Sequence, residues 1–222
     1  VPIFALTHIL GADRSMADEF LRWNRVLFAT SEEALAQMPA IEAECREYMR
    51  SAIRAKRARP GDDLLSALAA TSAEDGALSE EEIVSLATLI LVAGFDNTAN
   101  FIGTGAMALM RHPEQRDVLL EDIDGRIATV VEELLRHGRQ SVGSGVGNLG
   151  MPFAALEDVE IGGILIRKNE PILINRNAAN HDESVFADPL ELDVSREVNP
   201  HLTLSYGSHS CLGAPLARLE LQ

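Results

Sequence analysis

The chain has 222 residues, of which 46% are hydrophobic and 24% are charged, and its formal net charge is −15. Such a chain can bury a substantial core, and its composition excludes a disordered or low-complexity protein. The strong negative charge argues against a nucleic-acid partner, because phosphate recognition needs clustered cations.

The first clear element is an amphipathic helix over residues 40–57, with apolar side chains at helical spacing and a stop at Pro60 and Gly61. Cys45 lies on the apolar stripe of this helix, so we expect it to be a core residue. The other cysteine of the sequence is Cys211. Two cysteines without a framework of paired spacings favour a reducing, cytoplasmic setting over secretion.

A second, longer helix is expected downstream. Ser79 and Glu82 match a capping box, and apolar residues continue from there to Met110, which predicts one central helix of about 30 residues. Asp96 and Asn97 interrupt its apolar pattern, whereas a helix that crosses a bilayer needs roughly 20 predominantly apolar residues. We therefore expect no membrane span.

A short helix is predicted to begin at Pro113, followed by a break at Gly125 and another amphipathic helix. This last helix carries Glu133 and Arg136 one turn apart. Taken alone, a Glu-x-x-Arg pair is usually a surface salt bridge of little energetic value.

Over residues 138–175 the sequence pattern changes from helices to loops and strands. Four glycines between positions 143 and 150 predict an irregular loop, and the segment VEIGGILI predicts a hairpin with Gly162 and Gly163 at its turn. A further strand is predicted at 171–175. The loop lacks the lysine and the strand-to-helix setting that phosphate-binding loops require, so phosphate binding is not favoured.

Near the carboxyl end, Cys211 stands between Gly207 and Gly213 in a loop that leads into a helix opened by Pro215. The positive end of that helix would stabilise a thiolate. A lone cysteine in this setting is otherwise a structural residue. Part of a zinc site with His201 and His209 is a further alternative, but a fourth ligand at recognisable spacing is missing.

Three segments in this order carry a resemblance to a known family: LILVAGFDNTAN at 89–100, VEELLR at 131–136, and LTLSYGSHSCLGAPLARLE at the carboxyl end. Together they resemble the cytochrome P-450 family of haem-thiolate monooxygenases, specifically the soluble bacterial kind. The resemblance covers essentially the whole chain. It implies a mainly α fold with a small β subdomain, as one partial domain over residues 1–222 that lacks the family's amino-terminal part and final strands.

The resemblance also implies site residues. Cys211 matches the axial ligand of the iron in haem b, and His209 matches a position that often contacts a haem propionate. The expected cofactor-binding set is Ala93, Gly94, Leu204, Gly207, His209, Cys211 and Gly213. Glu133, Arg136 and Arg196 match a buried triad that supports the cysteine loop.

On the oxygen side of the haem, the resemblance implies a catalytic group of Asp96, Asn97 and Thr98. Asp96 matches the acid that delivers protons, and Asn97 stands where the family usually has threonine. Other departures are Leu204 and Ser205 in place of Phe-Gly at the start of the cysteine loop. Phe153 and His181 each replace a usual arginine.

Three functions remain open. The first is a monooxygenase that uses a ferredoxin or similar electron donor to insert one oxygen atom into a small hydrophobic organic substrate. The second is a haem-binding relative with little oxygenase activity, driven by peroxide or acting as a binding protein. The third is a haem-free helical module or defunct fragment. Basic residues that could meet an acidic donor, or simply face solvent, are Arg111, His112, Arg116 and Arg218.

Overall fold

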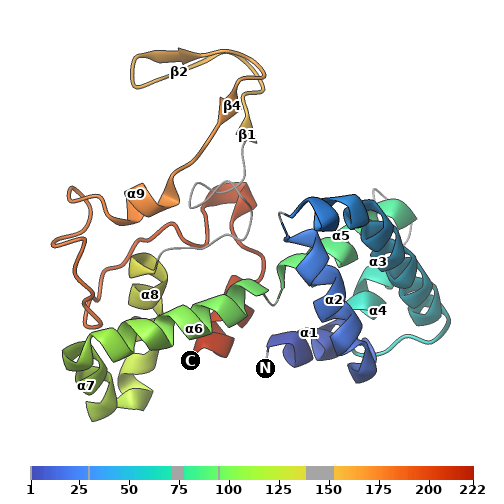
Figure 1. The fold of residues 1–222 in the computed structure, drawn as a ribbon, viewed down its shortest axis with the longest axis horizontal. Helices are drawn as coiled ribbons and strands as arrows, with labels where there is room; N and C mark the ends of the chain where they lie inside the picture. The colour runs from blue at the N-terminus through green and yellow to red at the C-terminus, as the bar shows by residue number, and fades with distance from the viewer. Residues whose placement is uncertain (1, 30, 72–77, 95, 139–152) are drawn as a thin grey trace. The chain divides into compact units, whose positions relative to one another are not determined.

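The computed structural model describes residues 2–29, 31–71, 78–94, 96–138 and 153–222 (Figure 1). Its internal contacts divide the chain into two compact units, Val1–Asn100 and Phe101–Gln222, which are described one at a time. The loop predicted from the glycines between 143 and 150 lies outside the described residues.

The first unit is helical in its described residues. Its elements are α1 (Pro2–Leu10), a short 3-10 helix (Arg14–Met16), α2 (Ala17–Leu27), α3 (Glu32–Ala58), α4 (Leu64–Ala70) and α5 (Glu80–Ala93). Their apolar faces meet in one core, whose fully buried members include Leu10, Phe20, Met49, Ile53, Leu65, Ile83 and Val84. Three aromatic rings, those of Phe20, Trp23 and Tyr48, lie within this unit with centroids 5.5–5.6 Å apart.

Helix α3 confirms the helix predicted over residues 40–57 and extends it toward the amino terminus. It begins after Ser31, whose side chain accepts a hydrogen bond from the amide of Ala34. Pro39 lies inside the helix, just before the predicted start, and it lacks a backbone N–H. Ile41, Cys45, Met49 and Ile53 recur every fourth residue and form the buried stripe.

Cys45 is fully buried, as predicted, and burial raises the pKa of its thiol from 9.0 to about 11. The thiol therefore ionises more readily in the unfolded chain. Its contribution to the free energy of unfolding is fully present below pH 9 and is lost as pH rises to about 11. We expect this group to account for about 2 to 3 kcal/mol of alkaline destabilisation. Urea unfolding across that range checks it: the stability gap between the parent and Cys45→Ala should narrow as pH rises. A constant gap would contradict it.

The single central helix predicted from Ser79 to Met110 is wrong, because the structure has two helices there. The capping box is confirmed and begins α5, which ends at Ala93, and α6 (Asp96–Arg111) follows. The break falls at Gly94, where a β-carbon would lie 2.5 Å from the carbonyl oxygen of Ile90 and 2.9 Å from Cδ1 of Leu6. Asp96 and Asn97 interrupt the apolar pattern just after this point, but two polar residues do not by themselves show that a helix ends.

One stretch of the described chain, Glu80–Arg111, is long and apolar enough to cross a membrane when judged by length and composition alone, with 29% of its most apolar window buried. Core helices of soluble proteins satisfy the same criterion.

The second unit contains most of α6 and then α7 (Pro113–Glu121), α8 (Ile123–His137), β1 (Phe153–Ala154), β2 (Val159–Ile161), β3 (Ile164–Ile166), β4 (Pro171–Ile172), α9 (Arg176–Asn180), a short 3-10 helix (Gly207–His209) and α10 (Ala214–Leu221). Its core is formed by Leu119, Val130, Leu192 and Val194. Helix α8 begins after Asp122, whose carboxylate accepts a hydrogen bond from the amide of Gly125. The break predicted at Gly125 therefore lies three residues too late.

The strands form two small antiparallel pairs. β2 pairs with β3 in the register Val159↔Ile166, which confirms the predicted hairpin, and Gly162 and Gly163 both have positive φ at its turn. β1 pairs with β4, which is shorter than the strand predicted at 171–175. The fold is thus mainly helical with a small β part, as expected.

Candidate functional site

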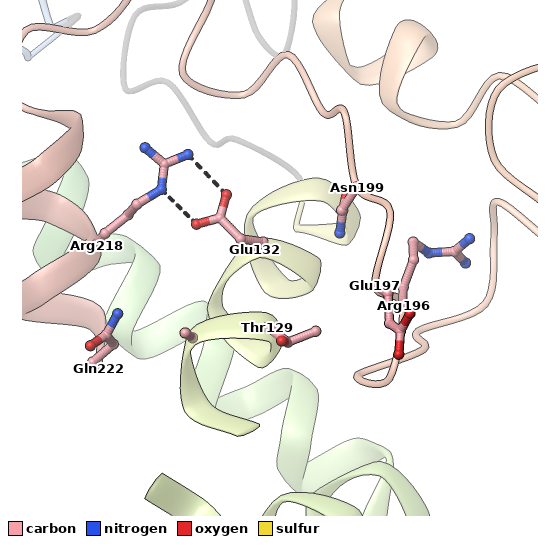
Figure 2. A pocket seen from close by; sticks show the side chains of 8 residues that line it. Thr129, Glu132, Arg196, Glu197, Asn199, Arg218 and Gln222 are labelled. Atoms are coloured by element: carbon pink, nitrogen blue, oxygen red, sulfur yellow. Dashed lines mark hydrogen bonds and ion pairs between the residues drawn. The ribbon is translucent and has the colours of Figure 1, made fainter. Parts of the chain in front are cut away.

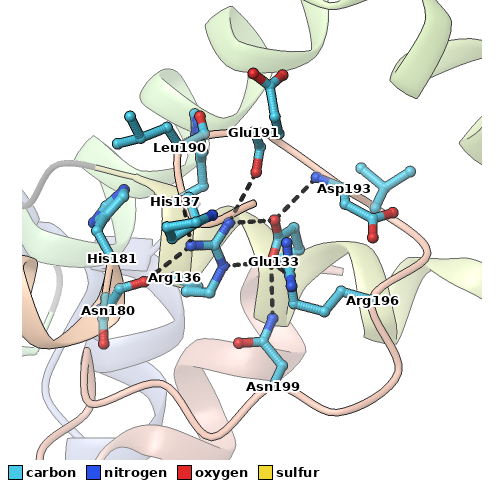
Figure 3. Close-up of polar contacts among 12 residues, drawn as sticks. Glu133, Arg136, His137, Asn180, His181, Leu190, Glu191, Asp193, Arg196 and Asn199 are labelled. Carbon is cyan, nitrogen blue, oxygen red and sulfur yellow. Dashed lines mark hydrogen bonds and ion pairs between the residues drawn. The ribbon is translucent and has the colours of Figure 1, made fainter. Parts of the chain in front are cut away.

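The ion pair between Glu133 and Arg136 is fully buried in α8 (Figure 3). Arg136 Nε donates to Glu133 Oε2 at 2.8 Å, and Arg136 Nη2 donates to Glu133 Oε1 at 2.7 Å. Such a two-pronged pair is the strongest form of this contact. The structure therefore rejects the surface salt bridge that the Glu-x-x-Arg pattern alone suggests.

The remaining N–H groups of Arg136 hold a coil that comes from far along the chain. They donate to the carbonyl oxygens of Asn180 at 2.9 Å, Pro189 at 2.7 Å and Glu191 at 3.0 Å. All five N–H donors of the guanidinium are thus used. Next to it, His137 Nε2 lies 3.1 Å from the carbonyl oxygen of Leu190, and burial lowers the pKa of this histidine.

Glu133 binds the continuation of the same coil. Its carboxylate accepts hydrogen bonds from the amide of Asp193 at 3.0 Å, Nε of Arg196 at 3.2 Å and Nδ2 of Asn199 at 3.0 Å. The structure therefore brings Glu133, Arg136 and Arg196 together. Asn199 and the Asp193 amide are partners that sequence reasoning missed, since nothing in their local pattern marks them.

Asn180 connects this coil to the segment that leads into the cysteine loop. It is buried, and its Oδ1 accepts from the amide of Leu202 at 2.7 Å while its Nδ2 donates to Thr203 Oγ1 at 2.8 Å. Thr203 in turn donates to the carbonyl oxygen of Leu135 in α8 at 2.6 Å. The chain is thereby fixed to α8 just before Leu204. Asn180 and Thr203 are further residues that sequence reasoning did not single out.

The loop around Cys211 is tight in its backbone and open at its surface. The carbonyl oxygen of Leu204 accepts a hydrogen bond from the amide of Cys211 at 2.8 Å, while Ser205 and Gly207 have φ of 64° and 75°. A β-carbon at Gly207 or Gly213 would meet no atom within 4 Å. Cys211 is a free, exposed thiol, and α10 begins just after it.

The donor set around Cys211 decides which kind of metal site is possible. His201 is already engaged, because its Nε2 lies 2.9 Å from Glu132 Oε2 and its Nδ1 accepts from the amide of Thr203 at 3.3 Å. The described residues contain no group of three or more side chains that could hold a metal ion. The zinc alternative with His201 and His209 is therefore wrong. A single accessible sulfur suits a metal whose other ligands belong to a macrocycle such as haem.

The residues expected on the oxygen side gather at the junction of α5 and α6. Ala93 is the last residue of α5, and Gly94 is its C-cap. Asp96 opens α6 and accepts a hydrogen bond from Asn100 Nδ2 at 3.1 Å. Asn97 is exposed, and Thr98 is buried.

The structure shows the positions of Phe153 and His181, which stand where the family usually has arginine. Phe153 lies in β1 opposite Ile172 and is half-exposed. His181 follows α9, and its Nδ1 lies 2.8 Å from the carbonyl oxygen of Asn177.

Three of the four residues considered for a basic surface have an acidic neighbour within reach. Arg116 pairs with Asp117 at 2.7 Å, Arg218 pairs with Glu132 at 2.6 Å, and His112 Nδ1 lies 3.5 Å from Glu114. The charges of Arg116 and Arg218 are thus partly compensated. Arg218 and Glu132 also line a polar cavity of about 260 Å³ together with Thr129, Arg196 and Asn199 (Figure 2).

Comparison with known proteins agrees with this geometry. The family model described as "Cytochrome P450" matches residues 5–222. The mycinamicin IV hydroxylase/epoxidase of Micromonospora griseorubida is 39% identical over 222 residues, which are 100% of this chain and 54% of that protein. The vitamin D(3) 25-hydroxylase of Pseudonocardia autotrophica is 37% identical, over 99% of this chain and 53% of that protein.

A solved structure shows the same fold. The bacillaene polyketide synthase cytochrome P450 PksS of Bacillus subtilis 168 superposes with a TM-score of 0.88 at 33% identity, over 99% of this chain and 55% of that chain. The chain thus spans about half the length of the relatives that it matches.

Proposed function

The chain belongs to the cytochrome P450 family, and from this premise we propose that the whole protein is a haem-dependent monooxygenase. It inserts one atom of dioxygen into a small hydrophobic organic substrate. One observation carries the proposal: an exposed thiol, Cys211, lies in an open loop preceded by a coil that a buried ion pair fixes to α8.

Within this proposal, Cys211 would hold the haem iron through its sulfur, and His209 would contact a propionate. A β-carbon at Gly207 or Gly213 would meet no atom within 4 Å, so the loop around Cys211 would leave room for a flat macrocycle. The chemistry that haem b would supply when bound is the activation of dioxygen, which a thiolate ligand favours. Glu133, Arg136 and Arg196 act as structural support, because they hold the coil that precedes the loop.

At the junction of α5 and α6, the small side chain of Ala93 would leave room for dioxygen, whereas Leu6 already fills the space beside Gly94. Asp96 holds and passes a proton at its carboxylate, and Asn97 and Thr98 offer hydrogen bonds to the reacting oxygen. Both units of the chain belong to one haem domain in this proposal.

Asn97 tests the proton-delivery part of the proposal. An amide is a weaker proton relay than a hydroxyl, so we expect Asn97→Thr to raise coupling, the product formed per electron donor consumed. Coupling is measured as product against donor oxidised and peroxide released, with Ala106→Thr at an exposed position of the same helix as the matched control. Unchanged coupling in Asn97→Thr would remove Asn97 from the mechanism.

The proposed partners follow from the family. Electrons come from a ferredoxin or similar donor, and the substrate is a small hydrophobic organic molecule. Two relatives are named as hydroxylases of mycinamicin IV and of vitamin D(3), which are organic molecules. In this proposal the protein acts in the cytoplasm. Its net charge of −15 argues against a nucleic-acid partner.

The absorption spectrum of the reduced, carbon-monoxide-treated protein, produced from the complete reading frame, tests the proposal. A strongly red-shifted Soret band is expected. A haem spectrum without that shift would favour a haem-binding relative with little oxygenase activity, and no haem at all would favour a haem-free module. Substrate-dependent oxidation of the electron donor then separates an oxygenase from a binding protein.

A further inference from the structure

Three histidine rings from three different elements lie in a row at the carboxyl end of α8. His112 directly precedes α7, His137 is the last residue of α8, and His181 directly follows α9. The ring centroids of His112 and His137 are 6.2 Å apart, and those of His137 and His181 are 6.1 Å apart. His137 is therefore the middle ring of the row, and it contacts the coil that Arg136 holds (Figure 3).

The hydrogen bonds of two of these rings fix where each carries its hydrogen. A carbonyl oxygen only accepts, so the ring nitrogen that lies beside one must donate. His137 Nε2 therefore donates to the carbonyl oxygen of Leu190 at 3.1 Å, and His181 Nδ1 donates to that of Asn177 at 2.8 Å. A further proton is taken up by the other nitrogen of each ring. Ionisation thus leaves both bonds in place and acts through charge alone.

The surroundings of His137 disfavour a positive charge. The nearby ionisable groups are Glu133 and Arg136 of α8, His181 after α9, and His112 with Glu114 at 3.5 Å from it. Burial lowers the pKa of His137, as do the charges of Arg136 and His181, and these outweigh the hydrogen bond to Leu190 and the charge of Glu133. The carboxylate of Glu133 is already bound by the guanidinium of Arg136.

The row of rings lies where the coil is attached to α8. Leu190 stands between two residues whose carbonyl oxygens accept hydrogen bonds from Arg136. His181 directly follows Asn180, whose side chain holds the segment that leads into the cysteine loop. Repulsion between His137 and His181 therefore acts directly on the attachment of the coil.

We propose that His112, His137 and His181 form a pH-sensitive latch on the coil over residues 182–199. At neutral pH the uncharged rings pack against one another and keep the coil on α8. Acidification charges the rings, and their mutual repulsion, together with that from Arg136, loosens the coil. The latch is a property of the second unit and does not depend on the proposed function.

The direction of the pH dependence follows from the surroundings of His137. Its pKa is lower in the closed latch than the ordinary value of 6.5, so its contribution is fully present above pH 6.5 and is lost as pH falls below that value. Opening of the coil should therefore become more frequent between about pH 7 and about pH 5. The increase is roughly tenfold for each unit by which the pKa rises on opening.

Hydrogen exchange of the complete protein at these two pH values tests the latch. Rates are expressed as protection factors, which remove the intrinsic pH dependence of exchange. The amides of Asp193 and Leu202, which are bonded to Glu133 and Asn180, report on the coil, and the amide of Ile83 in α5 is the reference. Protection of the coil amides is expected to fall on acidification while that of the reference amide stays high.

Two variants remove the charge and keep a hydrogen-bond donor. His137→Gln can still donate to the carbonyl oxygen of Leu190, and His181→Gln can still donate to that of Asn177. Each should lose most of the pH dependence of coil protection, and the second serves if the first does not fold. His8→Gln, at an exposed position of α1, removes a histidine from the first unit and should keep the pH dependence of the parent.

Two results would overturn the inference. One is coil protection in the parent that does not change between the two pH values, or that falls equally at the reference amide. The other is a parent-like pH dependence in His137→Gln and His181→Gln, which would assign the effect to other groups.

Discussion

Arg136→Ala is expected to destabilise the protein by about 3 to 5 kcal/mol, because it leaves the fully buried carboxylate of Glu133 without its main partner. It also removes the donors for the carbonyl oxygens of Asn180, Pro189 and Glu191. Since this coil leads to the cysteine loop, haem content should fall together with stability. Urea unfolding and the ratio of haem to protein measure the two effects.

The matched control is Arg116→Ala, which breaks an exposed pair with Asp117 on α7. Exposed pairs contribute about 0 to 1 kcal/mol, so this variant should keep both its stability and its haem. Arg136→Lys restores the charge but offers three donors in place of five, so an intermediate loss is expected. Normal haem loading of Arg136→Ala would refute the supporting role of the ion pair.

Cys211→Ser should abolish the red-shifted carbon-monoxide band while changing the free energy of unfolding of the haem-free protein by no more than about 0.5 kcal/mol. The reason is that Cys211 is exposed, so its replacement leaves no cavity. Cys45→Ser is the contrasting control, because it places a hydroxyl in the core of the first unit and should lower stability without affecting the spectrum. Retention of the band in Cys211→Ser would show that another group binds the iron.

Local signals in the sequence were enough to predict much of the fold. The capping box of Ser79 and Glu82 and the turn at Gly162 and Gly163 are set by neighbouring residues, and both are as predicted. The break at Gly94 was missed because one glycine after an apolar run does not by itself mark the end of a helix. Leu6, far away in the sequence, occupies the space that a side chain at position 94 would need.

The candidate site, too, could be predicted from local sequence only in part. The Glu133 and Arg136 pattern was visible, but its burial depends on partners from Asn180 to Asn199 that only the folded chain brings to α8. His201 was weighed as a metal ligand because of its type and spacing. Its engagement by Glu132 depends on how the coil crosses α8, which no local pattern encodes.

The end of α8 also determines the shape of the long coil in the second unit. The coil from Asp182 to Tyr206 has no strand ladder, and Glu133, Arg136 and Leu135 supply many of its anchoring hydrogen bonds. A single turn of helix therefore acts as the template on which the coil takes its shape. Fraying of this one turn would therefore free the coil that leads into the cysteine loop.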